Sequence, residues 1–411
     1  MQDESGVIRR IAWREICPWL IIFRSFRLSI SLPVLLLATA GWVLTPLGDV
    51  VANMLLLGNE ASTSTTWLPE TVSATQVRQL GVTLAEMPNP IRSVYEHLLS
   101  SPAKLLTTPM SAKTTGYHLV CSLWNIAVWS FFAVAICRIA AVQFGRQERV
   151  DLRSAIHYAA QKYAWSVAAP LFPIIGILLA GIPIALLGAL MRLDAGVFAA
   201  GLLWPFALVG GLIMAVLLFG LVAGWPLMWP TISSEHQGDA FEAFSRTYSY
   251  VFQRPLQYLF YGIVALLFGA ISWLLVSYIS EGVILLASNA ASWGAGTERM
   301  NALRQDGLPG VLGFGPNLID AFEFLVRIIA VAFNFSFFFC ISTAIYLVLR
   351  RDVDRTDFDD VFMEDDHDQY SLPPLKPNAD GVPGVSDEAK VANEPASGPA
   401  ASGDSDDATS A

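Results

Sequence analysis

Four polar side chains lie inside stretches of this sequence that are otherwise apolar, and they are the first candidates for chemistry. Glu323 and Arg327 are four residues apart, a spacing that places them on one face of a helix. Asn125 and Asn334 each stand within a long apolar run. Ionisable and amide groups are costly in lipid and are kept there mostly to bind a ligand, carry an ion or bond a neighbouring helix. Together these four residues form a candidate intramembrane polar site.

Two interpretations of this polar site stay open. In the first, it belongs to a path for an ion or a substrate. In the second, Glu323 and Arg327 form a local ion pair that reaches water near the membrane surface, and each asparagine bonds another helix. A proton or ion relay usually needs ionisable groups deeper in several helices, and the sequence has none there. We therefore favour the second interpretation.

Basic residues in short amphipathic segments form a second candidate surface. Residues 152–163 and 241–251 have helical spacing, and Asp239 with Glu242 three residues later predicts a helix N-terminus with a capping box. The predicted apolar faces are Leu152, Ile156, Ala159 and Tyr163 in the first segment, and Phe241, Phe244, Tyr248 and Val251 in the second. Such helices lie at the membrane interface, where basic side chains attract anionic headgroups. The predicted lipid-headgroup surface comprises Arg153, Lys162, Arg246 and Arg254.

The sequence contains no pattern typical of a catalytic or metal site. HExxH, GxSxG and Walker A motifs are absent, and the five histidines are scattered. Cys17, Cys121, Cys137 and Cys340 have no CxxC partner and lie in or beside apolar runs. We expect them to be small apolar residues rather than disulfide or zinc partners. We predict no catalytic residue, no cofactor and no metal, and we expect that the protein is not an enzyme.

The elements that must position these residues are membrane-spanning helices. The chain has 411 residues, of which 54% are hydrophobic and 15% charged, whereas soluble domains carry about 25% charged residues. A hydrocarbon core needs about 20 mostly apolar residues per helix, and backbone groups in lipid must be paired within the segment. Six stretches qualify, at about residues 28–47, 118–137, 166–191, 195–223, 256–280 and 328–349. The sequence predicts an all-α polytopic membrane protein with six transmembrane helices.

Lysine and arginine near the span ends predict the orientation. If six helices thread back and forth, 15 of these residues fall on the side that holds both termini, against 7 on the other. Basic residues concentrate in the cytoplasm, so we predict that both termini are cytoplasmic. Ala38-Thr39-Ala40 in the first span resembles the cleavage site of a secretory signal. The long leading segment and the apolar run beyond this point favour an uncleaved anchor.

The composition divides the chain into three regions. Residues 1–27 form a cytoplasmic amphipathic segment, and residues 28–351 form the transmembrane domain with outer loops at 48–117 and 281–318. The first loop has helix-like spacing at Ile91, Val94 and Leu98, but we expect both loops to cap the outer face. Residues 352–411 hold 16 acidic and 3 basic residues and are rich in Pro, Gly, Ala and Ser. We predict that this tail is cytoplasmic and largely disordered.

Three stretches carry a resemblance to known proteins. They are residues 137–143 (CRIAAVQ), residues 238–248 (GDAFEAFSRTY) followed by Arg254-Pro255, and residues 345–351 (IYLVLRR). Together they resemble an uncharacterised family of polytopic bacterial inner-membrane proteins. The second stretch is also similar to membrane domains found beside glycerophosphodiesterases. The resemblance implies a helical membrane body and supplies no catalytic residues, and the chain has no phosphodiesterase domain.

These observations favour a non-enzymatic membrane scaffold or accessory component in a bacterial inner membrane. Its expected partners are the lipid bilayer and other membrane proteins, not nucleic acid. The alternative is a transporter or permease subunit. That alternative draws on Pro183 inside the third span and on the polar side chains of the second and sixth spans.

Overall fold

The computed structural model describes residues 17–57, 88–107, 111–303, 311–363, 375–377 and 383–385. The chain divides into two compact units, Met1–Val361 and Phe362–Ala411. Most of the predicted N-terminal amphipathic segment, the middle of the first predicted outer loop and most of the acidic tail lie outside the described residues.

Among the described residues, six helices are long and apolar enough to cross a membrane, which confirms the predicted all-α polytopic fold. Their bounds are Leu32–Ala52 (α3), Ala112–Gly145 (α6), Tyr163–Leu190 (α8), Asp194–Ser234 (α9), Pro255–Ala295 (α11) and Val311–Asp354 (α13). Each overlaps one predicted span. Helices α11 and α13, with the short α12 (Thr297–Leu303), also occupy most of the second predicted outer loop, so much of that loop is helical.

Helix α13 is the centre of the first unit. Every residue from 331 to 350 is buried, and α3, α6, α9 and α11 pack around it. Phe335 stacks on Trp129 of α6 with ring centroids 4.2 Å apart, and Phe338 stacks on Trp225 of α9 at 5.2 Å. Lipid offers no hydrophobic driving force between helices, so close packing of this kind is what holds them together.

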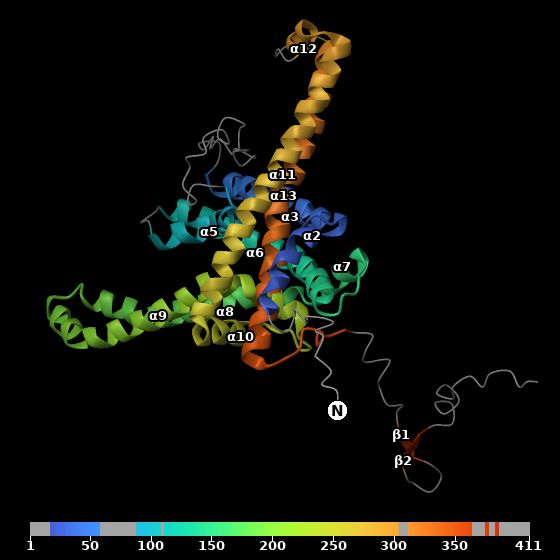
Figure 1. Ribbon diagram of the computed structural model, residues 1–411. Helices are drawn as coiled ribbons and strands as arrows, with labels where there is room; N and C mark the ends of the chain where they lie inside the picture. Colours follow the sequence, from blue (N-terminus) through green and yellow to red (C-terminus); the bar gives the residue numbers. More distant parts are fainter. Residues whose placement is uncertain are drawn as a thin grey trace, which may run out of the picture. The chain divides into compact units, whose positions relative to one another are not determined.

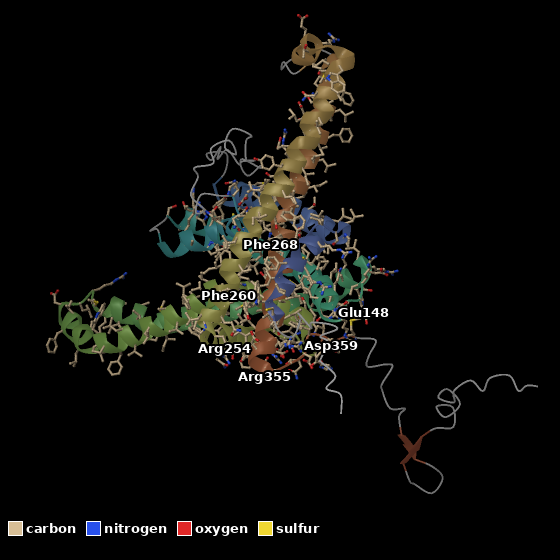
Figure 2. The ribbon with its side chains drawn as sticks, viewed as in Figure 1. Glu148, Arg254, Phe260, Phe268, Arg355 and Asp359 are labelled. Carbon is tan, nitrogen blue, oxygen red and sulfur yellow. The ribbon has the colours of Figure 1, made fainter. Side chains whose placement is uncertain are left out.

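Two helical hairpins extend from this centre. Helices α8 and α9 pair along one arm, and the outer halves of α11 and α13 pair along another, which leaves the centre in a different direction (Figure 1). Apolar side chains such as Leu178, Phe206 and Ile271 are exposed along the arms, and side chains project all along both of them (Figure 2). Exposed apolar surface of this extent is the part of the molecule that contacts lipid.

Helix α5 (Pro90–Thr107) falls within the first predicted outer loop but packs against α6, α11 and α13. Val94 and Leu98 are buried in that contact. At its start, the Asn89 side chain accepts a hydrogen bond from the Ile91 N–H at 2.9 Å and donates one to the Leu266 carbonyl of α11 at 2.6 Å. Residues 90–107 of the predicted outer loop thus form a helix that packs against the bundle, as their helix-like spacing indicates, and the place of this helix at the outer face stays a prediction.

The short segments before the spans are also helical, and the faces that they bury against the bundle differ from the predicted apolar faces, which we expect to lie in the headgroup boundary. Helices α7 (Leu152–Gln161) and α10 (Ala240–Gln253) pack through Ala155 and Tyr158 and through Ala243 and Thr247, respectively. Within the predicted apolar faces only Ala159 and Val251 are buried, and Phe241 is 63% exposed. Small side chains allow close approach to the bundle, which leaves the large apolar ones at its periphery.

The chain enters the first long helix through the 3-10 helix η1 (Pro18–Arg24) and α2 (Ser25–Ser29), and leaves it through a π-helical turn, η2 (Asn53–Leu57). Trp19 and Phe23 contact Phe260 and Phe268 of α11, with ring centroids 5.8 and 5.0 Å apart. Figure 2 shows Phe260 and Phe268 along α11, above Arg254 at its beginning.

The second unit contains a two-stranded antiparallel ribbon. Strands β1 (Leu375–Pro377) and β2 (Pro383–Val385) pair with Leu375 opposite Val385. The predicted tail begins at residue 352, but α13 continues to Asp354 and its end belongs to the first unit. The other tail residues beyond 363 lie outside the described residues.

Candidate functional site

A cluster of charged side chains gathers where α13 ends and α9 turns into α10. We call Glu235, Glu242, Arg246, Arg350 and Asp354 the basal cluster. Arg350 Nε lies 2.8 Å from Glu235 Oε1, and these side chains are only 6% and 7% exposed. Arg246 lies 3.3 Å from Glu235, 3.0 Å from Glu242 and 2.7 Å from Asp354. Each arginine of the cluster thus contacts at least one carboxylate.

Local sequence explains how α10 joins this cluster. Gly238 adopts φ +50°, a left-handed conformation that glycine takes readily, and reverses the chain after α9. Asp239 then caps α10 by accepting a hydrogen bond from the Glu242 N–H at 2.7 Å, while Glu242 accepts one from the Gly238 N–H at 3.0 Å. The predicted N-cap at Asp239 is confirmed, whereas Glu242 bonds the N–H of the residue before the cap instead of the N-cap N–H of a regular capping box. These two bonds fix Glu242 one turn before Arg246.

Two tyrosines complete the basal cluster. The Tyr346 hydroxyl donates to Glu235 Oε1 at 2.6 Å, and the Tyr250 hydroxyl donates to Asp354. Burial and the neighbouring Asp354 carboxylate raise the pKa of Tyr250 above its usual value, so its hydroxyl stays protonated and able to donate. The charged and hydroxyl groups of the cluster are thus paired with one another, and these pairs connect the end of α9 with α10 and α13.

A second polar contact closes the end of α9. Arg138 of α6 donates to the Ser233 carbonyl at 3.0 Å, and Tyr158 of α7 donates to the Ile232 carbonyl at 2.7 Å. The Arg138 guanidinium also lies 4.4 Å from the centre of the Tyr158 ring. A cation at a helix C-terminus is favourable because the last carbonyls lack intrahelical partners.

The four residues of the predicted headgroup surface separate into different environments. Arg153 and Arg254 are exposed, and Lys162 donates to the Gln237 carbonyl. Arg246 contacts three carboxylates and is 31% exposed, and its place in the headgroup surface stays a prediction. The helical spacing of residues 241–251 places Arg246 on the polar face of α10 but indicates none of the partners outside α10, Glu235 and Asp354, because these lie in other elements.

The predicted intramembrane polar site is only partly assembled. Arg327 lies 3.6 Å from Glu323, as the spacing predicts, and 3.4 Å from Glu281 of α11. We call Glu281, Glu323 and Arg327 the outer triad; their side chains are 24–39% exposed. Sequence reasoning missed Glu281, which it had placed at the start of a loop.

The two asparagines do not join this triad. Asn334 follows Arg327 by seven residues on α13, about two helical turns, and is 3% exposed. Its side-chain oxygen has no hydrogen-bond partner among the described residues. Asn125 is half-buried on α6, and no described hydrogen bond joins it to Asn334.

A histidine that the sequence analysis set aside lies inside the bundle. His97 of α5 packs between Trp42 of α3 and Phe335 of α13, with ring centroids 4.9 and 5.6 Å away. Its Nε2 atom is buried without a hydrogen-bond partner among the described residues. Burial lowers the pKa of His97 to about 4, although Asp49 acts in the opposite direction. Its ring is therefore neutral near pH 7.

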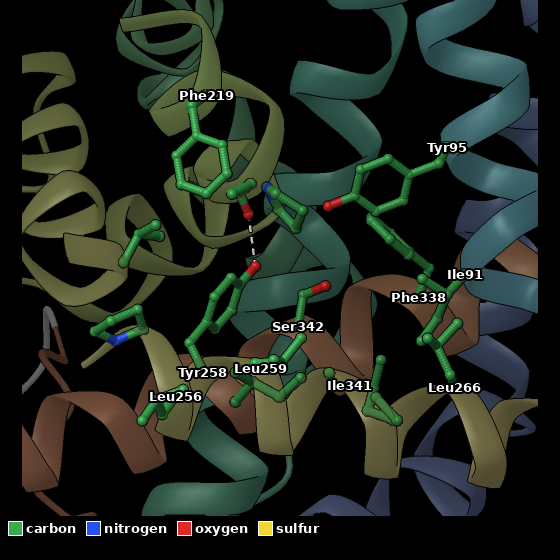
Figure 3. Close-up of a pocket in the computed structure, with 17 residues that line it drawn as sticks. Ile91, Tyr95, Phe219, Leu256, Tyr258, Leu259, Leu266, Phe338, Ile341 and Ser342 are labelled. Carbon is green, nitrogen blue, oxygen red and sulfur yellow. Dashed lines mark hydrogen bonds between the residues drawn. The ribbon is translucent and has the colours of Figure 1, made fainter. Parts of the chain in front are cut away.

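An apolar pocket of about 490 Å³, which we call the α9–α11 pocket, lies between these helices (Figure 3). It is lined by side chains from α5, α9, α10, α11 and α13, among them Tyr95, Phe219, Tyr258 and Phe338. Among the lining residues only Tyr95, Tyr258 and Ser342 carry polar side-chain atoms, and none is charged.

The two tyrosines of the pocket are bound to α9 next to a proline. Pro226 has no N–H, so the carbonyl of Val222, four residues earlier, lacks its helical donor. The Tyr95 hydroxyl donates to this carbonyl at 3.3 Å. The Tyr258 hydroxyl donates to the adjacent Ala223 carbonyl at 2.6 Å, as the dashed line in Figure 3 shows. Both hydroxyls are thus engaged with the protein.

The cysteines and acidic residues form no metal site in the described ranges. No group of three or more His, Cys, Asp or Glu side chains there is arranged to hold a metal ion. Cys121, Cys137 and Cys340 are buried and Cys17 is partly exposed, and all four are free thiols.

Comparisons with protein-family models, with curated proteins and with solved structures find no match to this chain. The resemblance to bacterial inner-membrane proteins therefore stays a prediction. The class that the fold itself defines is an α-helical multi-pass membrane protein.

Proposed function

We propose that this protein is a non-enzymatic scaffold or accessory component of a bacterial inner membrane, with both termini in the cytoplasm. The proposed orientation rests on the excess of lysine and arginine on one side of the spans. That side includes the exposed Arg153 and Arg254, which are suited to anionic headgroups or to an acidic membrane partner.

The observation that carries this proposal is the use of the buried charges. Arg350 and Glu235 are paired with each other, Arg246 is shared by three carboxylates, and Arg138 contacts a helix end. These contacts join α6, α9, α10 and α13. The charged groups that make them are engaged with one another or with a helix end, so they serve packing between helices instead of ligand binding. A rigid helical base with exposed cations beside it is suited to holding other components at the membrane.

The experiment compares the size of native assemblies in mild detergent. Wild-type protein extracted from its own membranes should migrate as a complex larger than the isolated chain with its detergent. Charge reversal at Arg153 and Arg254 should release the chain from that complex. Charge reversal at Arg192, which is exposed at the turn between α8 and α9, is the matched control and should leave the complex intact. A wild-type protein that runs only as an isolated chain would contradict the proposal.

The alternative function, a transporter or permease subunit, is favoured by one observation. Asn334 presents a buried oxygen without a described partner near the middle of the central helix. A transport path would bring water to this level. Its test is the reactivity of the native thiols Cys137 and Cys340, both 0% exposed, toward a membrane-impermeant thiol reagent. Protection of both thiols supports the scaffold, whereas labelling of either supports transport.

A further inference from the structure

The α9–α11 pocket has the length of one half of a bilayer. Its lining on α11 runs from Pro255 at the start of the helix to Leu266, which corresponds to about 16 Å of helix. A bilayer hydrocarbon core is about 30 Å thick. Because the predicted span on α11 begins at residue 256, we expect the pocket to extend from one membrane surface to about the midplane, the depth to which an acyl chain of that leaflet reaches.

The chemistry of the pocket suits hydrocarbon. The tyrosine hydroxyls at its wall already donate to the Val222 and Ala223 carbonyls, and no charged side chain lines it. Its volume of about 490 Å³ falls within the range of about 300–1,000 Å³ that is usual for small-molecule sites. A polar metabolite or an ion would find only the Ser342 hydroxyl as a side-chain partner inside, too little to compensate for its loss of water.

The rim of the pocket faces lipid and ends at a cation. Phe219, Leu256 and Leu259 line the pocket and are 60%, 81% and 58% exposed. The deep wall, formed by Phe338 and Ile341, is nearly fully buried. Arg254 directly precedes Pro255 and Leu256 and is exposed. Because Arg254 adjoins two lining residues in the chain, the headgroup of an acyl chain bound here would lie at the end of the pocket where this cation is found.

We propose that the α9–α11 pocket binds one acyl chain of an anionic phospholipid, with Arg254 at its phosphate headgroup. This site goes beyond the proposed scaffold function and does not depend on it. The hydroxyls of Tyr95 and Tyr258 in the pocket wall are bonded to backbone carbonyls. The small residues Ala223, Gly262 and Ala265 leave space for the acyl chain. The positive charge of Arg254 favours an anionic headgroup.

The test uses phosphatidylglycerol with a photoreactive acyl chain, incorporated with the full-length protein into nanodiscs. Cross-links are mapped by mass spectrometry and compared with those on the exposed face of α8, which reports bulk lipid. We expect enrichment of cross-links at pocket-lining residues over α8 for phosphatidylglycerol. Phosphatidylcholine carrying the same chain should show less enrichment.

Two glycines of α11 provide the matched variants. A Cβ added at Gly262 or at Gly282 meets no atom within 4 Å, so Gly262→Leu and Gly282→Leu change helix propensity equally and cause no clash at Cβ. Only Gly262 lines the pocket. We expect Gly262→Leu to reduce pocket cross-linking to the level of α8, and Gly282→Leu to leave it unchanged.

The arginine is tested separately. Arg254→Gln should lower the preference for phosphatidylglycerol over phosphatidylcholine about fivefold, the effect of one basic residue near an anionic surface. Pocket cross-linking that is no higher than on α8, or that is unchanged in Gly262→Leu, would overturn the pocket. Equal labelling by both lipids in the wild type would overturn the anionic headgroup.

Discussion

The basal cluster and the outer triad contain the same chemistry in different surroundings. In each, an arginine lies between carboxylates from two or more elements. The Arg350–Glu235 pair of the basal cluster is 6–7% exposed, whereas the side chains of the outer triad are 24–39% exposed. Because a lone buried charge is costly and an exposed one is not, the two sites should differ sharply in what their loss costs.

The largest effect is expected from Arg350→Met. This change removes the closest cation of the buried Glu235, which keeps Arg246 and Tyr346 as partners. It should reduce the free energy of unfolding by about 3 kcal/mol, the lower end for breaking a buried ion pair, measured by chemical or thermal unfolding in detergent. Arg351→Met, at the neighbouring half-buried position, is the control. If both variants unfolded alike, the Arg350–Glu235 pair would contribute no more to stability than the half-buried Arg351 does.

The next effect is expected from Tyr346→Phe. This variant removes only the hydroxyl that donates to Glu235 at 2.6 Å, and hydrogen bonds to charged groups contribute about 2 kcal/mol. The same unfolding assay measures it. Tyr278→Phe on the exposed arm of α11 should leave stability unchanged, and an equal loss in both would show that the Glu235 contact adds nothing.

His97 extends the comparison to a buried base without an ionic partner. Its pKa in the folded protein is about 4, against about 6.5 in an unfolded chain. The stability that comes from its neutral form is therefore complete above pH 6.5 and is lost as the pH falls toward 4. At pH 5.5 the loss should be ~1 kcal/mol.

The measurement is the unfolding temperature between pH 7.5 and 5 for the wild type and for His97→Phe. The variant should lose the part of the acid sensitivity that His97 contributes, and His157→Gln on the exposed face of α7 should keep it. Identical pH profiles for the wild type and His97→Phe would place the titration elsewhere.

The smallest effect is expected from Arg327→Met. Partly exposed ion pairs contribute about 0–1 kcal/mol, so this variant should unfold nearly like the wild type. Comparison with Arg350→Met in one assay gives the contrast directly. A loss as large as that of Arg350→Met would mean that lipid, not water, surrounds the outer triad.

The six long helices could be predicted from the sequence because lipid requires an unbroken apolar run for every crossing. Their ends could not, since hydropathy detects the apolar part of a helix and α11 and α13 continue through polar positions such as Glu281 and Asp320. Helix α5 shows helical spacing in the sequence but is too polar for a span, so hydropathy gives no indication that its apolar face packs against the bundle.

The candidate site was predictable only where its members share a helix. Glu323 and Arg327 are one turn apart, and so are Glu242 and Arg246. Glu281 lies 46 positions from Arg327 in the sequence, so no helical spacing connects them. Glu235 lies just after α9 and Arg350 near the end of α13, where charged residues are typical of exposed surface. The apolar pocket could not be predicted from the sequence. Its lining residues are of the same apolar types as other residues of the spans, and the pocket exists only because the helices separate at this place.

The unequal reach of the helices has a consequence for the surrounding bilayer. Helix α8 has 28 residues and α11 has 41, so their axes measure about 42 and 61 Å. A hydrocarbon slab of about 30 Å cannot match both when they stand upright. The longer helix must tilt, stand clear of the membrane or thicken the lipid next to it. The protein should therefore prefer membranes of particular thickness.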